Sequence, residues 1–157
     1  MPKILITGTI PKQARKNLED LKLDIIERGV SDLVEEKAFI DTIKDIDIYL
    51  NGGYEIITRA VLEAANALKL MIFLGTDAGT YIDLVAAKEK NVQVCNTPAA
   101  NALSVAEFTV GLIINAQRRI PFSVAPSNTN NAYKTYHTAY GKTLGLIGFG
   151  NIGSHVS

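Results

Sequence analysis

Short β-branched runs alternate with segments of helical period along the first hundred residues, and no other feature of the chain constrains its fold as strongly. This order of strand, helix and strand is typical of βαβ units, which build a parallel sheet. The predicted strands are 4–7, 23–27, 47–51, 70–74 and 92–96, and the predicted helices between them are 12–21, 34–43, 58–67 and 82–90. We therefore predict an α/β domain over residues 1–100, with a flavodoxin-like, five-stranded parallel sheet.

Local signals mark where three helices begin. Thr58 and Thr80 are predicted to cap the third and fourth helices of this domain, and Asp83 stands at capping-box spacing from Thr80. Ser104 and Glu107 show the same spacing at the start of a longer helix, which ends near two arginines beside its negative end.

The longer helix is apolar on almost every side over residues 105–116, so we expect other parts of the protein to cover it. Residues 121–140 follow and are rich in Ser, Asn, Thr and Pro. We interpret them as an interdomain or oligomer-contact loop. The helix and the loop together form a predicted linking region, 101–140.

The chain then enters a strand, a glycine-rich turn and a nascent helix. A predicted strand at 143–147 runs into a G-x-G-x-x-G motif made of Gly148, Phe149, Gly150, Asn151, Ile152 and Gly153. In this context the motif is typical of a dinucleotide-binding turn. Gly148 would permit the tight turn, Gly150 the approach of a pyrophosphate, and Gly153 close packing of helix on strand. An ordinary glycine turn is the alternative.

A Rossmann domain that starts at this turn would be incomplete. The acidic residue that binds the cofactor ribose would lie about 20 residues further on, beyond Ser157. The choice between NAD and NADP is therefore left open. We predict that residues 141–157 are the first part of a truncated Rossmann domain.

Glycines also follow three of the predicted strands of the first domain, at Gly8, at Gly52 and Gly53, and at Gly75. In open α/β sheets, ligands bind in the crevice outside the carboxyl ends of the strands. Exposed backbone amides at Gly52, Gly53 and Thr76 could hold a carboxylate, because successive N–H groups form anion-binding concavities. The alternative is ordinary βα turns, which favour glycine for its backbone conformation.

Composition argues against several classes of partner. Sixteen basic residues balance sixteen acidic ones, which leaves no net field to hold nucleic acid or an anionic membrane and favours small-molecule partners. No apolar run approaches the roughly 20 residues that cross a bilayer, and no signal-peptide core is present, so a cytoplasmic location is expected. The single cysteine, Cys95, cannot form an internal disulfide, and no metal site is predicted.

Several motifs together resemble the D-isomer-specific 2-hydroxyacid dehydrogenases, which include phosphoglycerate, glycerate and D-lactate dehydrogenases. They are the strand-end glycines, Asp83, and the stretches NTPAANALSVAEFTVGLIINAQRRIP and GKTLGLIGFGNIG. The resemblance spans nearly the whole chain. It implies a substrate-binding domain and an NAD-binding domain that enclose a cleft, where hydride passes between C2 of a 2-hydroxy or 2-oxo acid and the nicotinamide. It also implies a homodimer for the full-length form.

The resemblance assigns roles to individual residues. Those implied to face the substrate are the backbone of Gly52, Gly53, Gly75 and Thr76 and the side chain of Asn101. Those implied to contact the cofactor are Ser104, Gly148, Phe149, Gly150, Asn151, Ile152 and Gly153. Residues 1–100 would then be the substrate-binding domain.

Two departures from the family pattern fall on the substrate side. The family usually shows G-x-G-x-D-x-I-D, whereas this chain has one residue more between Gly75 and Asp83. Residues 51–55 stand where many members carry an Arg-Ser-x-Thr-like loop. The longer loop leaves the assignment of the Thr76 amide open. The second difference indicates a substrate that the best-known relatives do not define, and Tyr54 is a candidate either for shaping its pocket or for covering the pocket edge.

The family's catalytic Arg, Glu and His match no residue of this chain, and His137 and His155 are predicted to be solvated surface histidines. We therefore expect the N-terminal part of an NAD-dependent dehydrogenase. By itself it should lack useful turnover, since losing the general acid–base group alone costs roughly 10²–10⁴-fold in rate. Two other hypotheses remain open: a non-catalytic carboxylate- or NAD-binding module, like related corepressors, and an inert product of truncation.

Overall fold

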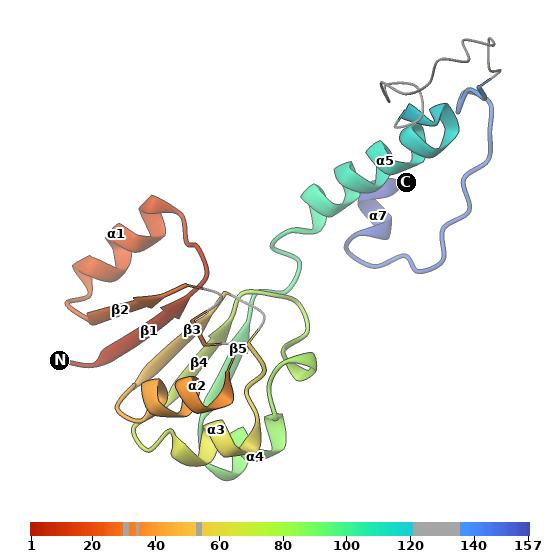
Figure 1. Ribbon diagram of the computed structural model, residues 1–157. Coiled ribbons are helices and arrows are strands. Elements are labelled where there is room, and N and C mark those ends of the chain that lie inside the picture. The colour runs from red at the N-terminus through yellow and green to blue at the C-terminus, as the bar shows by residue number, and fades with distance from the viewer. Residues whose placement is uncertain (30–31, 34, 53–54, 121–135) are drawn as a thin grey trace, which may run out of the picture. The chain divides into compact units, whose positions relative to one another are not determined.

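A computed structural model describes the chain except for residues 30–31, 34, 53–54 and 121–135. The chain divides into two compact units, Met1–Pro98 and Ala99–Ser157. The first unit contains a five-stranded parallel sheet with the order β2-β1-β3-β4-β5 (Figure 1). This is the strand order of a flavodoxin-like sheet, so the predicted fold class is confirmed.

Each strand lies within one residue of its predicted position. The strands are β1 (Lys3–Thr7), β2 (Asp24–Arg28), β3 (Ile48–Asn51), β4 (Leu70–Phe73) and β5 (Gln93–Asn96). The helices of this unit are α1 (Lys12–Asp20), α2 (Glu36–Ile43), α3 (Arg59–Ala64) and α4 (Leu84–Glu89), with a short 3-10 helix, η1 (Ala78–Thr80), before α4.

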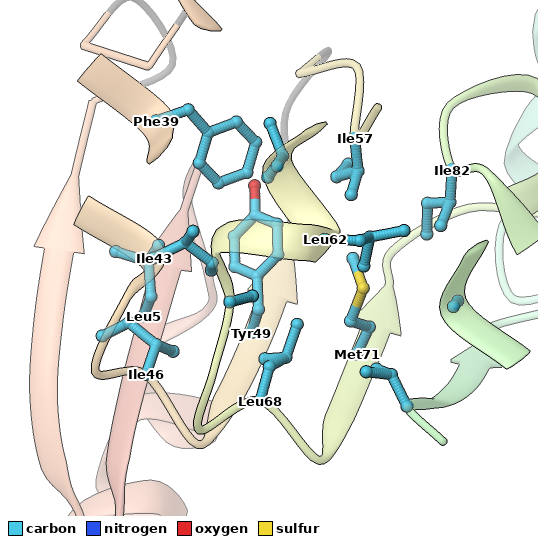
Figure 2. Packing of buried hydrophobic residues seen from close by; sticks show 14 of the residues in the cluster. Leu5, Phe39, Ile43, Ile46, Tyr49, Ile57, Leu62, Leu68, Met71 and Ile82 are labelled. Atoms are coloured by element: carbon cyan, nitrogen blue, oxygen red, sulfur yellow. The ribbon is translucent and has the colours of Figure 1, made fainter. Parts of the chain in front are cut away.

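Alternate strand residues supply two apolar layers, one on each face of the sheet. The larger layer contains Leu5, Tyr49 and Met71, which Figure 2 shows with side chains of α2 and α3. Phe73 and side chains of α4 belong to the same layer. Within it the Phe39 ring meets the Tyr49 ring edge-on, with centroids 5.4 Å apart. The smaller layer contains Ile4, Ile6 and Leu50, with Leu18 of α1 packed against them. The core of this unit therefore lies mainly between the sheet and α2 to α4.

One of the two predicted caps in this unit is confirmed. Thr58 caps α3, because its side chain accepts a hydrogen bond from the Val61 N–H at 3.4 Å. Thr80 does not cap α4, because it lies in η1. Asp83 is the cap instead, accepting from the Ala86 N–H at 2.8 Å. The chain makes a 3-10 turn first, so α4 begins later than its sequence pattern predicts.

The second unit contains α5 (Ala102–Arg118) and the short α7 (Gly153–Val156). The helix α5 begins two residues before Ser104, so the predicted Ser104 cap is wrong and Ser104 lies inside the helix. Only Ala102 and Ala106 of α5 are buried. Its exposed apolar side chains are Leu103, Phe108, Val110, Leu112 and Ile114.

The strand predicted at 143–147 is not formed. Leu144, Leu146 and Ile147 are exposed, and no described strand pairs with this segment. A β-strand needs a neighbouring strand to satisfy its backbone groups, and an apolar sequence alone does not supply one. The segment leads into the glycine turn and α7 without regular structure of its own.

Candidate functional site

The predicted substrate side lies at the carboxyl edge of the sheet. The strand register pairs Thr7 with Asn51, Asn51 with Phe73, and Phe73 with Asn96, which are the last residues of β1, β3, β4 and β5. The loops that follow these strands therefore leave from neighbouring points. This edge is where open α/β sheets bind ligands.

Gly52 continues the sheet at this edge. Its N–H donates to the Thr7 carbonyl at 3.0 Å. A Cβ on Gly8, whose φ is +81°, would lie 2.6 Å from the Gly52 carbonyl oxygen, so the ends of β1 and β3 meet too closely for a side chain. The predicted exposed amide at Gly52 is therefore wrong, because β1 uses that donor. Gly53 and Tyr54, the next predicted site residues, lie outside the described residues.

Gly75 shapes the loop after β4. Its N–H donates to the Phe73 carbonyl at 2.9 Å, and its own carbonyl accepts from the Thr97 N–H at 3.1 Å. A Cβ at this position would lie 2.4 Å from Cε1 of Phe73. Glycine is therefore required for close packing here, and the Gly75 N–H is already used.

Thr76 is the predicted donor that stays accessible. It is exposed, and among the described residues its N–H donates no hydrogen bond. Its carbonyl accepts from Asn96 Nδ2 at 2.6 Å. Asp77 holds the other end of the loop, because its carboxylate accepts from the Gly79 N–H and the Thr80 hydroxyl, each at 3.0 Å. No local sequence pattern predicts this supporting role of Asn96 and Asp77.

Thr7, Tyr49 and Glu55 form a buried polar cluster that was not predicted from the sequence. The Thr7 hydroxyl donates to Glu55 Oε2 at 3.3 Å and lies 3.0 Å from the Tyr49 hydroxyl. A hydroxyl carries one proton, so Tyr49 donates to Thr7. Burial raises the pKa of Tyr49 well above its usual value, and the Glu55 charge adds to the increase. No local pattern reveals this cluster, since Thr7 is 42 residues from Tyr49 and 48 from Glu55.

Asn101 and Ser104 both lie at the exposed start of α5. Asn101 is the residue before the first turn, and its carbonyl accepts from the Val105 N–H at 3.0 Å. Ser104 follows within that turn. Their roles toward substrate and cofactor stay predictions.

The backbone of the glycine turn at 148–153 can be compared with the pattern of a dinucleotide-binding motif. Gly148 has a φ of +91°, which favours glycine. A Cβ on Gly153 would lie 2.4 Å from the Gly148 carbonyl oxygen, whereas a Cβ on Gly150 would meet nothing within 4 Å. The φ of Gly148 and the close approach at Gly153 thus explain glycine at these two positions. Both features agree with the first and third glycines of the dinucleotide-binding motif. The intervening Phe149, Asn151 and Ile152 are exposed.

His137 and His155 are exposed, so both are surface histidines as predicted. In the described part of the chain, no cluster of His, Cys, Asp and Glu could hold a metal ion. None of the helices described is both long and apolar enough to cross a membrane.

Comparison with known proteins identifies the family to which the chain belongs. Residues 4–144 match the family described as D-isomer specific 2-hydroxyacid dehydrogenase, catalytic domain. The chain belongs to this family, as the sequence motifs indicated.

Individual relatives extend well beyond the part that this chain matches. It is 35% identical over 159 residues to D-3-phosphoglycerate dehydrogenase of Methanocaldococcus jannaschii, covering 99% of the chain and 29% of that protein. It is 31% identical over 161 residues to hydroxypyruvate reductase of Thermotoga maritima, covering 99% of the chain and 50% of that protein. The solved structure of NAD-dependent formate dehydrogenase from Staphylococcus aureus in complex with NAD matches with a TM-score of 0.77 at 25% identity, over 98% of this chain and 51% of that one. The chain thus spans about half or less of their length.

Proposed function

We propose that the protein containing this chain is a nicotinamide-dependent oxidoreductase acting on the CH–OH group of a small D-2-hydroxy acid, or on the matching 2-oxo acid. The observation that carries the proposal is the glycine turn at 148–153, in which the φ of Gly148 and the close packing at Gly153 agree with the dinucleotide-binding motif. Membership of the D-isomer-specific 2-hydroxyacid dehydrogenase family supports the same reaction.

NAD is the proposed cofactor, with NADP as the alternative. The formate dehydrogenase to which the chain is similar was solved with NAD. The backbone of Gly148 to Gly153 would hold the pyrophosphate, and the family pattern assigns Ser104 to the same cofactor. When bound, the nicotinamide supplies the hydride acceptor or donor for C2 of the substrate.

The carboxyl edge of the sheet is the proposed substrate side. The exposed Thr76 N–H would donate to the substrate carboxylate, and Gly53 is the predicted second donor. Gly52 and Gly75 would act through loop shape, since their N–H groups are used within the unit. Asn101 would contribute its side-chain amide. Relatives named for phosphoglycerate and for hydroxypyruvate are both similar to the chain, so the proposed substrate class is small 2-hydroxy and 2-oxo acids.

For the 157 residues by themselves we propose binding without turnover. No residue of the chain matches the catalytic Arg, Glu and His of the family pattern, and the missing acid–base group alone lowers a rate roughly 10²–10⁴-fold. We propose that the full-length form is a homodimer. Sedimentation of that form would show a monomer if this is incorrect.

The substrate side can be tested on the chain itself by NMR titration of ¹⁵N-labelled protein with D-glycerate at constant ionic strength. We expect a saturable shift of the Thr76 amide, because a carboxylate would accept from that N–H. Glycerol, which lacks the carboxylate, is the matched control and should leave the amide unchanged. A D-glycerate titration that moves no residue of the β4–α4 loop would refute the proposed substrate side.

Turnover is tested on the longest natural form of the protein. NADH oxidation is measured with glyoxylate and hydroxypyruvate as 2-oxo acids, and Gly150→Val is the matched variant because its side chain would fill the open side of the turn. We expect the wild type to oxidise NADH with these 2-oxo acids and Gly150→Val to show no such activity. A form with the family's catalytic residues that oxidises no NADH with any 2-oxo acid would favour a non-catalytic binding module.

A further inference from the structure

We propose that Asn96 is a positioning residue of the substrate side: its side-chain amide fixes the loop after β4 so that two successive backbone N–H groups, those of Thr76 and Asp77, face outward together. This inference rests on the proposed function, because it concerns the carboxylate site that the function requires. The role is indirect, since Asn96 acts through the Thr76 carbonyl.

Two hydrogen bonds from the end of β5 set the orientation of this loop. The Thr97 N–H donates to the Gly75 carbonyl at 3.1 Å, and Asn96 Nδ2 donates to the Thr76 carbonyl at 2.6 Å. The two carbonyls belong to the peptide groups whose N–H donors are Thr76 and Asp77. In a trans peptide the N–H points opposite to the carbonyl, and no described peptide bond is cis. Both N–H groups are therefore directed away from the end of β5.

Neither N–H donates a hydrogen bond among the described residues, and Thr76 and Asp77 are both exposed. Two adjacent, outward-directed amide donors form a small anion-binding surface of the kind that accepts a carboxylate. Without the Asn96 bond, the Thr76–Asp77 peptide could rotate and present its carbonyl oxygen instead. Such a rotation would replace a donor by a lone pair that repels the ligand.

The position of Asn96 explains why an amide side chain is needed there. Asn96 ends β5 directly opposite Phe73, which ends β4, so its side chain reaches the neighbouring loop without leaving the sheet register. An aspartate has the same size but carries no donor, and it would set a negative oxygen against the Thr76 carbonyl. Asn96 is exposed and belongs to neither apolar layer, so replacing it should affect loop orientation far more than stability.

The carboxylate of Asp77 opposes anion binding at these two N–H groups, because its negative charge repels an anionic ligand. Its two hydrogen bonds, to Gly79 and Thr80, turn it toward the following residues. Neutralising it should therefore strengthen anion binding. Asp77→Asn keeps an acceptor for the Gly79 N–H while removing the charge.

The test is the D-glycerate titration of the full 157-residue chain, extended to variants. Asn96→Asp and Asn96→Ala should weaken D-glycerate binding about fivefold or more, which corresponds to the loss of one hydrogen bond, with melting temperature nearly unchanged. Asn96→Gln, which keeps an amide donor, should recover part of the affinity, and Asp77→Asn should raise it. Asn66→Asp is the matched control, since Asn66 is exposed and lies before β4, at the opposite edge of the sheet.

The outcomes separate this inference from the proposed function. If the wild-type chain binds no D-glycerate, the substrate side itself is refuted and Asn96 has nothing to position. If the wild type binds but Asn96→Asp and Asn96→Ala bind equally well, the inference alone is refuted. If affinity and melting temperature fall together in every Asn96 variant, with no separate change in the Asp77 amide shift, Asn96 is merely structural. A fall in affinity at constant melting temperature, spared in Asn66→Asp, supports the inference.

Discussion

The two units of the chain follow the same local rules but differ in what surrounds their apolar side chains. In Met1–Pro98 every strand has a hydrogen-bonded neighbour, and Phe39 is 1% exposed. In Ala99–Ser157 Phe108 is 66% exposed, and none of the strands that the structure describes pairs with the apolar segment 143–147. Apolar pattern therefore decides which elements a sequence can form, whereas burial depends on a complementary surface. Matched substitutions in the two units test this contrast.

The largest expected effect is the truncation of a core phenylalanine. Phe39→Ala removes a fully buried ring that packs edge-on against Tyr49, so it should lower the free energy of unfolding by about 3–5 kcal/mol. Phe108→Ala makes the same chemical change on an exposed face of α5 and should cost less than about 0.5 kcal/mol. Urea denaturation of the 157-residue chain measures both.

The Phe108→Ala result can contradict the contrast between a buried first unit and an exposed α5. A cost for Phe108→Ala close to that of Phe39→Ala would mean that α5 is covered in solution, for instance by a second copy of the chain. Repeating the measurement over a range of protein concentrations would separate a dimer from a monomer, because only a dimer becomes more stable with concentration.

The next effect is the loss of the hydroxyl at the centre of the buried polar cluster. Thr7→Val keeps the shape of the side chain but leaves Glu55 Oε2 without its donor, and should cost about 1–3 kcal/mol. Thr109→Val is the control, since the Thr109 hydroxyl only bonds the Val105 carbonyl within α5, and should cost less than about 0.5 kcal/mol. Equal costs for the two variants would argue that Glu55 is not held by Thr7.

Features set by neighbouring residues were predictable from the sequence. The five strands follow from apolar runs bounded by turns, and the Thr58 cap follows from a hydroxyl three residues before the N–H that it accepts. The glycine turn follows likewise from local spacing. Its backbone form agrees with the motif even though the strand predicted before it is not formed, because that strand needs a partner that local sequence does not provide.

Features set by distant residues were not predictable. The amide of Gly52 looks free in the sequence, but β1 takes it through the Thr7 carbonyl. Asn96 reads as the end of a strand, and only the register of β4 and β5 brings it to Thr76, 20 residues away. Glu55 follows the polar and glycine residues after β3, so nothing local predicts that it is buried, and its hydroxyl partner Thr7 is 48 residues distant. The candidate site is built mainly from such distant pairs. The sequence therefore predicted that the site lies at the carboxyl edge of the sheet, whereas the structure was needed to show which N–H groups there are available as donors.

A smaller effect compares a helix cap that is formed with one that is not. Thr58→Ala should cost about 0.5–2 kcal/mol, because it leaves the Val61 N–H without its acceptor. Ser104→Ala should change the free energy of unfolding by less than about 0.5 kcal/mol, because Ser104 lies inside α5 and does not cap it. A cost above about 1 kcal/mol for Ser104→Ala in thermal unfolding would contradict this and would indicate that Ser104 forms the capping box predicted from the sequence.

The smallest effect at neutral pH is the removal of the buried tyrosine hydroxyl. Tyr49→Phe loses one hydrogen bond to Thr7 and should cost about 0.5–1.5 kcal/mol near pH 7. Its signature lies in alkaline solution. The pKa of Tyr49 is raised in the folded state by burial, so the unfolded chain ionises first, and the wild type loses stability as pH rises above the unfolded value of about 10. Phenylalanine does not ionise, so the difference in free energy of unfolding between wild type and Tyr49→Phe should shrink in urea denaturation above that pH.

The control is Tyr140→Phe, at a position 91% exposed in the second unit, whose free energy of unfolding should depend on pH with the wild-type slope. A Tyr49→Phe curve parallel to the wild type from pH 8 to pH 11 would show that the hydroxyl of Tyr49 is open to solvent, and the contrast between the two units would then rest on apolar burial alone.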